Sequence, residues 1–499
     1  MSVLSLDFGT SFLKACLFAA DGRLLASVSE ELNARTPRSG EVELDPEAGW
    51  DAACRAVRKT LLEAGVASSD VHAVCATGTT LVTVYDESGR ALRPSICFGD
   101  MRLPPQEDIE TILQSVGPER IAAAFGLREL DDHTLAIILS TLTSSKLLWL
   151  RANEPETYAH TRAAVTTGWE LLNMRLTGTV SHQENPIEVE TRISELFDVP
   201  RSWFGDQYRT GEVVGRVSGE AASRTGLPKG TPVVAGAWDS MCGFLGSGMT
   251  RPGIALNIAG TTDVLAVASR TGEPAGGGFV VRHIIPGLWV VTLSPIRGPT
   301  LDWFRDLLVD GERSYSEFDD LVAGAAPGSG GLLCLPYMSG EKGAVRDLDA
   351  RGILLGLDVA HTRADLARAA VEGSILELRR ILDGYEGAGL RVDEVRVSGG
   401  RARSRLWNQM KADILGRVVH VLAVPETGCL GSAILASVAI GVQSDLASGA
   451  DSMVHIAEAI VPDPDTVDLY AEVFDVYREM YQTNRGLLAG VARLRNRLL

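Results

Sequence analysis

The stretch SLDFGTSFLKACLF, residues 5–18, decides how the chain begins to fold. Two apolar runs flank a polar cluster that contains Asp7, Gly9, Thr10 and Ser11. Apolar runs joined by a tight glycine turn predict a β-hairpin. A plain hairpin turn needs neither a carboxylate nor two hydroxyl groups, so we interpret this turn as a site that holds a polar ligand.

A second stretch, GIALNIAGTTDVLAVAS at residues 253–269, repeats the outline of the first. Gly260, Thr261 and Thr262 form its turn between two apolar strands. Two such hairpins, about half a chain apart, predict two related domains that face each other across a cleft. Two unrelated hairpins are the alternative, because Gly and Thr are common in turns.

The rest of the chain alternates β-rich blocks with helices, which is typical of an α/β protein. A double glycine, Gly399-Gly400, follows an apolar strand and could admit an adenine or ribose, or be a plain turn. We expect a β-meander over 3–32, a helix over 45–65, strand–turn–strand over 71–92, a short strand over 231–239, a Thr362-capped helix over 362–389 and a terminal helix over 469–499.

Composition excludes several classes of protein. The 499 residues suggest two or more domains, and the formal net charge of −17 argues against a nucleic-acid-binding or anionic-membrane surface. The seven cysteines include no CxxC pair, so we expect free thiols in a reducing cytoplasm. We expect no signal peptide and no membrane span. Dinucleotide-fold, P-loop, HExxH and GxSxG motifs are missing from the sequence.

Asp7 suggests what the first turn holds. Glycine turns with hydroxyl groups suit phosphate, but a carboxylate repels a bare phosphate unless a cation such as Mg²⁺ lies between them. The first turn and Gly260-Thr261-Thr262 would then be the two halves of a clamp for a nucleotide and Mg²⁺. The alternative is that Asp7 simply caps the turn at the end of its strand.

Asp239 is the second carboxylate of interest. It ends an apolar strand between Trp238 and Ser240, where it would be fixed and partly removed from water, as a base for a sugar hydroxyl should be. It could instead be the N-cap of the following helix, and the two roles are compatible.

Six motifs in the right order resemble the FGGY carbohydrate kinases of the actin/hexokinase/Hsp70 superfamily, over nearly the whole chain. The resemblance implies an α/β fold with two actin-like, ribonuclease-H-like ATPase domains facing a central cleft: residues 1–245, residues 246–445 and a helical extension over 446–499. The motifs are LDFGTSFLKACLFAADGRLLAS (6–27), SSKLLWLRANEPETY with LTG (144–158, 176–178), AGAWDSMCGFLGSGM (235–249), IAGTTDVL (258–265), residues 335–373 and VSGGRARSRLWNQMKADILGRVV (397–419).

The resemblance implies a cytoplasmic sugar kinase that uses ATP and Mg²⁺, with Asp239 as general base and Asp7 as a Mg²⁺ ligand. A homodimer is common among such proteins and is expected here only on that ground. The residues implied to bind the phosphates are Thr10, Ser11, Gly260, Thr261 and Thr262, with Gly298 near the ribose or phosphates, and the adenosine pocket would contain Gly399, Gly400, Arg401 and Ser404.

The sugar pocket departs from the xylulose kinases, which the chain otherwise resembles most. Those kinases usually have Gln-Met-His-Gly where this chain has ATGTTLV (76–82), and Trp-Asn-Asp-x-Arg where it has FGDMR (98–102). We therefore expect a ketose such as a pentulose, with D-xylulose disfavoured. The substrate-binding residues would be Thr79, Thr80, Asp100, Arg102, Asp239 and Ser240.

Other functions remain alternatives on the sequence alone. One is a polyol kinase of the glycerol or erythritol type, and another is a non-catalytic sugar- or nucleotide-binding regulator. Because a pure binding protein needs no base, the presence of Asp7 and Asp239 favours an enzyme.

Overall fold

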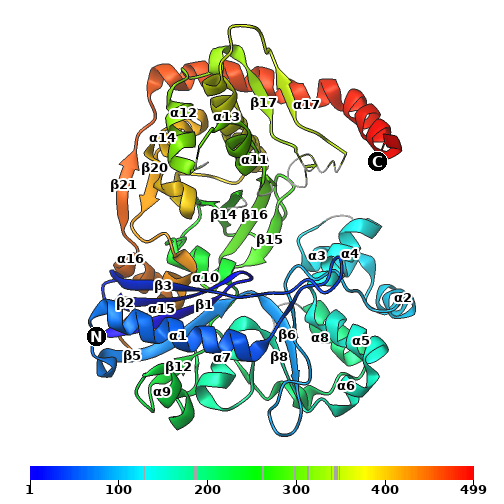
Figure 1. The fold of residues 1–499 in the computed structure, drawn as a ribbon, viewed down its shortest axis with the longest axis vertical. Helices are drawn as coiled ribbons and strands as arrows, with labels where there is room; N and C mark the ends of the chain where they lie inside the picture. Colours follow the sequence, from blue (N-terminus) through cyan, green and yellow to red (C-terminus); the bar gives the residue numbers. More distant parts are fainter. Residues whose placement is uncertain are drawn as a thin grey trace. The chain divides into compact units, whose positions relative to one another are not determined.

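The computed structural model of the chain describes residues 1–127, 130–184, 188–260, 263–296, 299–311, 314–338, 340, 341, 345, 347 and 349–498. Contacts within the chain divide these residues into two compact units, each built around its own β-sheet (Figure 1). Unit 1 comprises Met1–Thr250, Arg282–Pro286 and Glu426–His455, and unit 2 comprises Arg251–Val281, Gly287–Pro425 and Ile456–Leu499.

The main sheet of unit 1 has six strands in the order β11-β12-β5-β1-β2-β3. The strands are β1 (Ser2–Phe8), β2 (Phe12–Ala19), β3 (Leu24–Glu31), β5 (Val71–Gly78), β11 (Val213–Arg216) and β12 (Pro232–Val234). β1, β2 and β3 pair antiparallel, which confirms the predicted meander. β5 pairs parallel with both β1 and β12, so the ends of these three strands lie at one edge of the sheet.

Two smaller sheets complete the strands of unit 1. Their strands are β4 (Glu43–Leu44), β6 (Thr80–Tyr85), β7 (Ser95–Cys97) and β8 (Ala163–Thr167) in one sheet, and β9 (Ser181–Gln183) and β10 (Asp206–Tyr208) in the other. The chain leaves the main sheet at Thr79 and enters the four-stranded sheet at once. The first strand of the strand–turn–strand predicted over 71–92 is therefore two strands in different sheets.

The helices of unit 1 cover both faces of its main sheet. They are α1 (Pro46–Ala64), α2 (Gln106–Ser115), α3 (Pro118–Ala124), α4 (Asp132–Thr141), α5 (Thr143–Asn153), α6 (Pro155–His160), α7 (Gly168–Thr177), α8 (Glu188–Leu196), α9 (Gly219–Thr225), α10 (Asp239–Gly246), α15 (Thr427–Ala439) and α16 (Leu446–Met453). In Figure 1, α1 and α7 lie on one face and α15 lies on the other.

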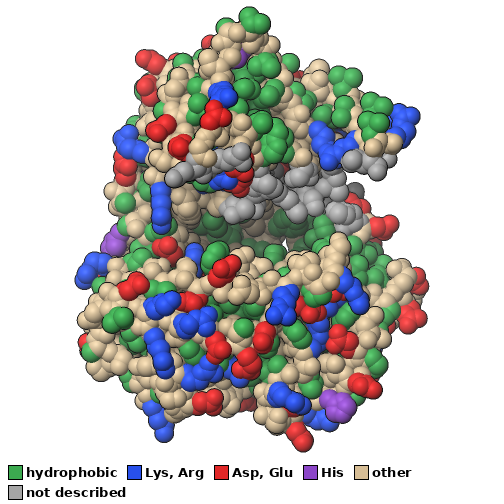
Figure 2. Space-filling model, in the orientation of Figure 1, with side chains coloured by type: hydrophobic (Ala, Val, Ile, Leu, Met, Phe, Trp, Pro, Cys, Tyr) green, Lys and Arg blue, Asp and Glu red, His purple; other side chains and the backbone are tan. Residues whose placement is uncertain are grey.

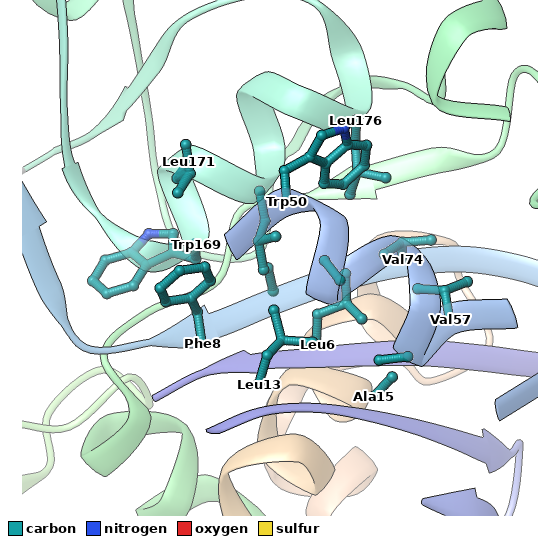
Figure 3. Packing of buried hydrophobic residues seen from close by; sticks show 14 of the residues in the cluster. Leu6, Phe8, Leu13, Ala15, Trp50, Val57, Val74, Trp169, Leu171 and Leu176 are labelled. Carbon is teal, nitrogen blue, oxygen red and sulfur yellow. The ribbon is translucent and has the colours of Figure 1, made fainter. Parts of the chain in front are cut away.

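The core of unit 1 lies between the sheet and the helices α1 and α7. Apolar side chains on alternate positions of β1, including Leu6 and Phe8, point toward Trp50 of α1 and Trp169 of α7 (Figure 3). This alternation is the normal arrangement of a strand with one face in a core. Asp45 caps α1 through its side chain, and the helix confirms the one predicted over 45–65.

Helix α15 belongs to unit 1 although it comes late in the sequence. It packs on β1, β5 and α10, and it is apolar on all sides, as expected for a buried helix. At Gly431 an added Cβ would come within 1.8 Å of the Cys242 carbonyl oxygen, so only glycine permits this approach. The boundary expected at residue 445 therefore differs from the contact units, which assign Glu426–His455 to unit 1.

Unit 2 has a seven-stranded sheet in the order β15-β16-β14-β13-β19-β20-β21. Its strands are β13 (Ile254–Ala259), β14 (Asp263–Ser269), β15 (Phe279–Arg282), β16 (Trp289–Ile296), β19 (Glu394–Ser398), β20 (Val419–Leu422) and β21 (Ile456–Ile460), and β17 (Leu333–Leu335) pairs separately with β18 (Ile353–Leu355). The helices are α11 (Pro299–Leu308), α12 (Tyr315–Ala323), α13 (Arg363–Gly387), α14 (Arg405–Leu415) and α17 (Pro464–Leu498).

Two predicted helices of unit 2 are confirmed. Thr362 and Asp365 form a complete capping box at the start of α13. The terminal helix α17 packs against α13 and α14, and its Tyr470 and Tyr477 lie in the core of the unit. Figure 1 shows α17 running to the C-terminus at the end of the colour scale.

The two main sheets share one strand order, which confirms the repeat predicted from the hairpins. In unit 2, β14 is antiparallel to β13 and to β16, whereas β19 is parallel to β13 and to β20. The strands β3-β2-β1-β5-β12 of unit 1 follow the same pattern. The turn residues Thr261 and Thr262 lie outside the described residues.

Acidic and basic side chains are intermixed on the face of unit 1 that Figure 2 shows. The net charge of −17 therefore does not gather there into a single acidic patch. Among the described residues no single helix is long and apolar enough to cross a membrane, although α4 and α5, bent by 84° at their junction, qualify together on length and composition.

Candidate active site

Unit 1 contains a pocket of about 360 Å³ at the edge where β1, β5 and β12 end. Five residues predicted from the sequence line it: Thr10, Thr79, Thr80, Asp239 and Ser240. The remaining lining residues are Phe98, Phe125, Thr141, Leu142, Thr143, Thr166, Thr167, Trp169, Glu170, His182, Gln183, Glu190 and Trp238. Hydroxyl groups and aromatic rings thus form most of the wall, a combination that suits a small polyhydroxy ligand.

Asp239 is the first residue of α10, and its side chain opens into this pocket while protein atoms surround it on its other sides. Trp238 is the N-cap and no side chain caps the helix, so the alternative reading of Asp239 as the N-cap is wrong. Asp239 Oδ1 instead accepts a 2.6 Å hydrogen bond from the N–H of Ser240. Loss of hydration, reinforced by the nearby charge of Asp7, raises the pKa of Asp239 to about 7.

Asp7 lies at the end of β1, beside Lys14 of β2 and Thr77 of β5. Its Oδ1 is buried and has no hydrogen-bond partner among the described residues. Burial raises the pKa of Asp7 above its usual range, and Lys14 opposes that shift. A buried carboxylate oxygen without a partner is costly unless another group, such as a cation, binds it.

Close backbone contacts hold Asp7 and Asp239 in place. An added Cβ at Gly236 would come within 1.6 Å of the Ala76 carbonyl oxygen, so the chain leading to Asp239 can lie against β5 only as glycine. The Thr77 hydroxyl donates a 2.8 Å hydrogen bond to the Ala237 carbonyl. An added Cβ at Gly428 would lie 3.8 Å from Asp7 Oδ2 and 3.5 Å from the backbone carbonyl oxygen of Asp239, so the first turn of α15 borders the Asp7 carboxylate and the Asp239 backbone.

The sequence analysis missed the pair Glu170 and His182 in the pocket wall. His182 Nδ1 lies 2.8 Å from Glu170 Oε1. Glu170 also accepts hydrogen bonds from the N–H groups of Thr166 and Gln183, at 2.8 and 3.0 Å. Burial opposes both charges, yet each partner stabilises the other: the pKa of Glu170 is lowered and the pKa of His182 is raised.

Glu190 is a second wall residue that the sequence analysis missed. Its carboxylate accepts hydrogen bonds from the N–H groups of Thr143 and Ser144 at the start of α5, at 2.7 and 3.0 Å. Hydroxyl groups of the same two residues donate two further bonds. A carboxylate at a helix N-terminus is favourably placed. Its partners are 46 and 47 residues away in sequence, and no local pattern signals such a contact.

Asp100 and Arg102, predicted to bind substrate, do not line the pocket. The Arg102 side chain donates to both carboxylate oxygens of Asp100, at 2.6–3.0 Å, and is also paired with Glu43 at 2.8 Å. Lys146 lies 3.3 Å from Asp100 Oδ1. These side chains are buried in an ion cluster that satisfies its own charges. Ser11 is exposed at the hairpin turn and is not part of the wall either.

Unit 2 contains a separate pocket of about 660 Å³. Four predicted residues line it: Gly260, Gly400, Arg401 and Ser404. Arg401 Nη2 donates a 3.1 Å hydrogen bond to the Tyr315 hydroxyl, and its guanidinium lies 5.9 Å from the Trp407 ring centre. Aromatic rings and a guanidinium suit the planar base of a nucleotide.

Gly399 does not line this pocket but shapes its edge. It has a φ of +90°, and an added Cβ would come within 2.6 Å of the Ala259 carbonyl oxygen. Both observations require glycine there. The predicted residues Thr261, Thr262 and Gly298 lie outside the described residues. Among the described residues no cluster of three or more His, Cys, Asp or Glu side chains could hold a metal by itself.

Comparisons with known proteins agree with this geometry. The model of the FGGY carbohydrate kinase N-terminal domain matches residues 2–246, and that of the C-terminal domain matches residues 255–440. The chain is 27% identical to a xylulose kinase of Staphylococcus epidermidis, over 99% of both chains. It is 26% identical to an autoinducer-2 kinase of Salmonella paratyphi B, over 98% of this chain and 95% of the other.

A solved structure extends the comparison to three dimensions. The crystal structure of a xylulose kinase from Rhodospirillum rubrum is 30% identical and superposes with a TM-score of 0.81, covering 98% of this chain and 100% of the other. Both domain models, in order, cover most of the sequence. The chain therefore belongs to the FGGY family of carbohydrate kinases.

Proposed function

We propose that this protein transfers the γ-phosphate of ATP to a hydroxyl group of a small ketose such as a pentulose, with Mg²⁺ as the metal ion. The observation that carries the proposal is the pocket of unit 1, where Asp239 faces a wall of hydroxyl groups and aromatic rings. Membership of the FGGY family supports sugar phosphorylation and ATP as the donor.

Asp239 is proposed as the general base. A base works best when its pKa lies near the working pH, and loss of hydration together with Asp7 raises the pKa of Asp239 to about 7. The carboxylate therefore takes the proton of the sugar hydroxyl as that oxygen attacks phosphorus. Because Asp239 Oδ1 accepts the Ser240 N–H, Oδ2 is the atom left to receive the proton.

The sugar is held by neutral donors close to this base. Thr79 and Thr80 lie where the chain enters the second sheet, and Ser240 follows the base. Their hydroxyl groups both donate and accept, so they can pair with several sugar hydroxyls. This positioning of the acceptor contributes more to phosphoryl transfer than covalent chemistry does.

Asp7 is proposed to hold Mg²⁺. Its buried Oδ1 lacks a partner among the described residues, as expected for a carboxylate that binds a cation. When bound, the ion would neutralise negative charge on the phosphates. Mg²⁺ in kinases keeps several waters and few protein ligands, which agrees with a single carboxylate.

The nucleotide is proposed to bind in the pocket of unit 2. Tyr315, Trp407 and Arg401 would contact the base and ribose, and Gly260 and Gly400 would let the backbone approach the ligand closely. By family resemblance Thr10, Ser11, Thr261, Thr262 and Gly298 would bind the phosphates or ribose, and Gly399 and Ser404 would complete the adenosine side.

The experiment that tests the proposal is ATP-dependent ADP release with a panel of pentuloses, other ketoses, aldoses and polyols. One class of sugar should give strong turnover, and Asp239→Asn should lower kcat by about 10²- to 10⁴-fold, the usual contribution of a general base. Calorimetry should find ATP binding unchanged in the variant. A polyol as the best substrate would replace the ketose in the proposal.

The pH profile provides the control for the role of Asp239. Because the base must be deprotonated, kcat/KM should fall about tenfold per pH unit below pH 7, where the carboxyl becomes protonated. In Asp239→Asn the residual activity should lack this limb. Normal turnover in the variant, or no sugar-dependent ADP release from the unmodified protein, would refute the proposed mechanism.

A further inference from the structure

Most of the ionisable side chains in the described wall of the sugar pocket are acidic. The ionisable side chains are Glu170, His182, Glu190 and Asp239, and no lysine or arginine is among the described residues that line the pocket. His182 is thus the only side chain of the described wall that can carry a positive charge. Glu170 and Glu190 already accept several hydrogen bonds each from the protein.

We propose that His182, held in its donor form by Glu170, hydrogen-bonds an oxygen of an uncharged sugar, and that the pocket therefore selects neutral sugars and rejects sugar acids. The inference rests on the proposed function and names the substrate class of the same site. The oxygen concerned is taken to be other than the hydroxyl that Asp239 deprotonates, because His182 comes from β9 and Asp239 from α10.

Two tryptophans connect the part of the wall that holds Asp239 with the part that holds Glu170. Trp238 directly precedes Asp239, and Trp169 directly precedes Glu170. The two indoles meet edge to face, with ring centres 5.7 Å apart. In the proposal, a sugar lying along this aromatic wall presents one hydroxyl to Asp239 and another oxygen to His182.

The ring orientation of His182 determines which nitrogen is available. Nδ1 faces Glu170 at 2.8 Å, and the ring packs on Phe204 with centres 5.1 Å apart. Nε2 is then the nitrogen left for a ligand. His182 also lines a neighbouring cavity of about 130 Å³. In the neutral ring with Nδ1–H toward Glu170, Nε2 only accepts, so donation from Nε2 requires the charged ring.

The groups around His182 favour that charged ring. Burial and the repulsion from Arg201, in the short helix Arg201–Phe204, oppose the charge on His182. The attraction of Glu170 on α7 and Glu190 on α8 is larger, so the pKa of His182 is raised. The Glu170–His182 pair has no net charge, so it offers a strong donor without attracting anions. A sugar carboxylate would meet Glu190 and Asp239 with no unpaired cation nearby.

The test measures the dissociation constants of the four pentuloses (D- and L-xylulose, D- and L-ribulose) and of D-xylonate by calorimetry, with kcat and KM alongside. His182→Phe keeps an aromatic ring against Phe204 and removes the donor. We expect its Kd and KM for the best pentulose to rise about ten- to hundredfold, the usual range for a hydrogen bond to a charged group. We expect kcat to change less than about threefold, because the base is intact.

Two variants make the result specific. His182→Gln retains an N–H donor and should recover part of the lost affinity. His160→Gln is the matched control, since His160 is an exposed residue of α6 whose Nδ1 lies 2.7 Å from the backbone oxygen of Glu156 in the same helix. It should leave kcat, KM and Kd unchanged.

The pH dependence of Kd provides a readout that a merely structural role of Glu170 would not move. In the unmodified protein, Kd should rise as the pH increases through the pKa of His182 and the donor is lost. Glu170→Gln removes the stabilising charge, so the rise should begin at lower pH. This measurement on the unmodified protein decides the question even where His182→Phe fails to fold.

The outcomes separate the inference from the proposed function. Unchanged Kd and KM in a folded His182→Phe, a Kd independent of pH, or D-xylonate binding as tightly as the pentuloses would each overturn the inference. Pentulose binding with the expected His182 effects but no phosphorylation would overturn only the proposed function. If neither pentuloses nor D-xylonate bind, both are overturned for this substrate class.

Discussion

The two main sheets have the same backbone arrangement where their central strands end. One residue at this edge differs between them. Asp7, the penultimate residue of β1, pairs with Thr77, and Gly78 follows. Ile258, the penultimate residue of β13, pairs with Ser398, and Gly399 follows. At each glycine an added Cβ would come within 2.5 or 2.6 Å of the carbonyl oxygen that ends the neighbouring strand.

The comparison shows that the repeated fold provides the same backbone geometry twice, whereas the side chain at the equivalent position differs. Both units bring a glycine turn next to a strand end, which leaves room for a ligand against the backbone. Unit 1 has a buried carboxylate there, and Asp7 contributes to the raised pKa of Asp239, the proposed base. Unit 2 has an apolar residue, and its pocket is shaped by aromatic rings and Arg401 instead.

The largest effect is expected from changing Asp7, the side chain that differs between the two sheet edges. Asp7→Asn removes the charge proposed to bind Mg²⁺ and should lower kcat by at least about 100-fold, a loss of several kcal/mol of transition-state stabilisation. The measurement is sugar-dependent ADP release at saturating and at varied Mg²⁺. A shift in the Mg²⁺ requirement should accompany the loss.

Ile258→Val is the matched control at the equivalent position of unit 2. It shortens an apolar side chain by one methylene and should cost about 0.5–1.5 kcal/mol of stability while kcat stays within about threefold. Equal losses of kcat in both variants would mean that the strand ends act through packing rather than through the charge of Asp7.

The shared glycines allow a test of the similarity itself. Gly78→Ala and Gly399→Ala each place a methyl group against a backbone oxygen, and Gly399 also has a φ of +90°. Each change should lower the free energy of unfolding by about 2–3 kcal/mol. Thermal unfolding monitored by circular dichroism measures the effect.

The control for these glycines lies in the terminal helix. Gly486 is in α17 and an added Cβ there meets nothing within 4 Å. Gly486→Ala should therefore stabilise the protein by about 0.5–1 kcal/mol, since alanine is the better helix former. Full stability of Gly78→Ala or Gly399→Ala would contradict the claim that both positions require glycine.

The smallest expected effect concerns a buried charge in unit 2. Lys411 of α14 is buried, its Nζ has no hydrogen-bond partner among the described residues, and burial lowers the pKa of Lys411 to about 8. Unfolded lysine titrates near about 10.5. Between these values the unfolded chain binds more protons, so stability rises with pH there and is reduced below pH 8.

Lys411→Met should therefore raise the free energy of unfolding by about 1–2 kcal/mol at pH 7 and by much less at pH 10. Urea unfolding at the two pH values tests this. Lys59, an exposed residue of α1 paired with Glu30, provides the control for removing a surface lysine: Lys59→Met should change the free energy of unfolding by less than about 1 kcal/mol at pH 7. A Lys411→Met variant that is less stable at pH 7 would mean that the amine has a partner of its own.

The sequence predicted the features that depend on neighbouring residues. The two hairpins, the helix capped by Asp45 and the capping box of Thr362 are all visible as local patterns. Thr10 and Asp239 were singled out from their places after apolar strands, and Thr79, Thr80 and Ser240 from the family resemblance, and all five line the pocket of unit 1.

Features that depend on distant residues escaped prediction. Glu170 meets His182 only because α7 and β9 pack together, and a lone histidine carries no local signal. Arg102 was predicted to bind the sugar, but Glu43, 59 residues earlier, draws it into a buried cluster with Asp100. The position of Glu170 three residues after Thr167 at a helix start is the one local clue that a sequence analysis could have used.

The packing of α15 on the first sheet also affects how the protein is made. β1 is complete after 8 residues, yet α15, which covers one face of its sheet, begins at Thr427. On the ribosome, most of unit 2 must be synthesised before α15 can bury that face of the first sheet. Release of a nascent chain at residue 425 would leave this apolar face open to chaperones and to other unfinished chains. The sheet that contains the first strand to be synthesised is therefore covered on both faces only near the end of synthesis.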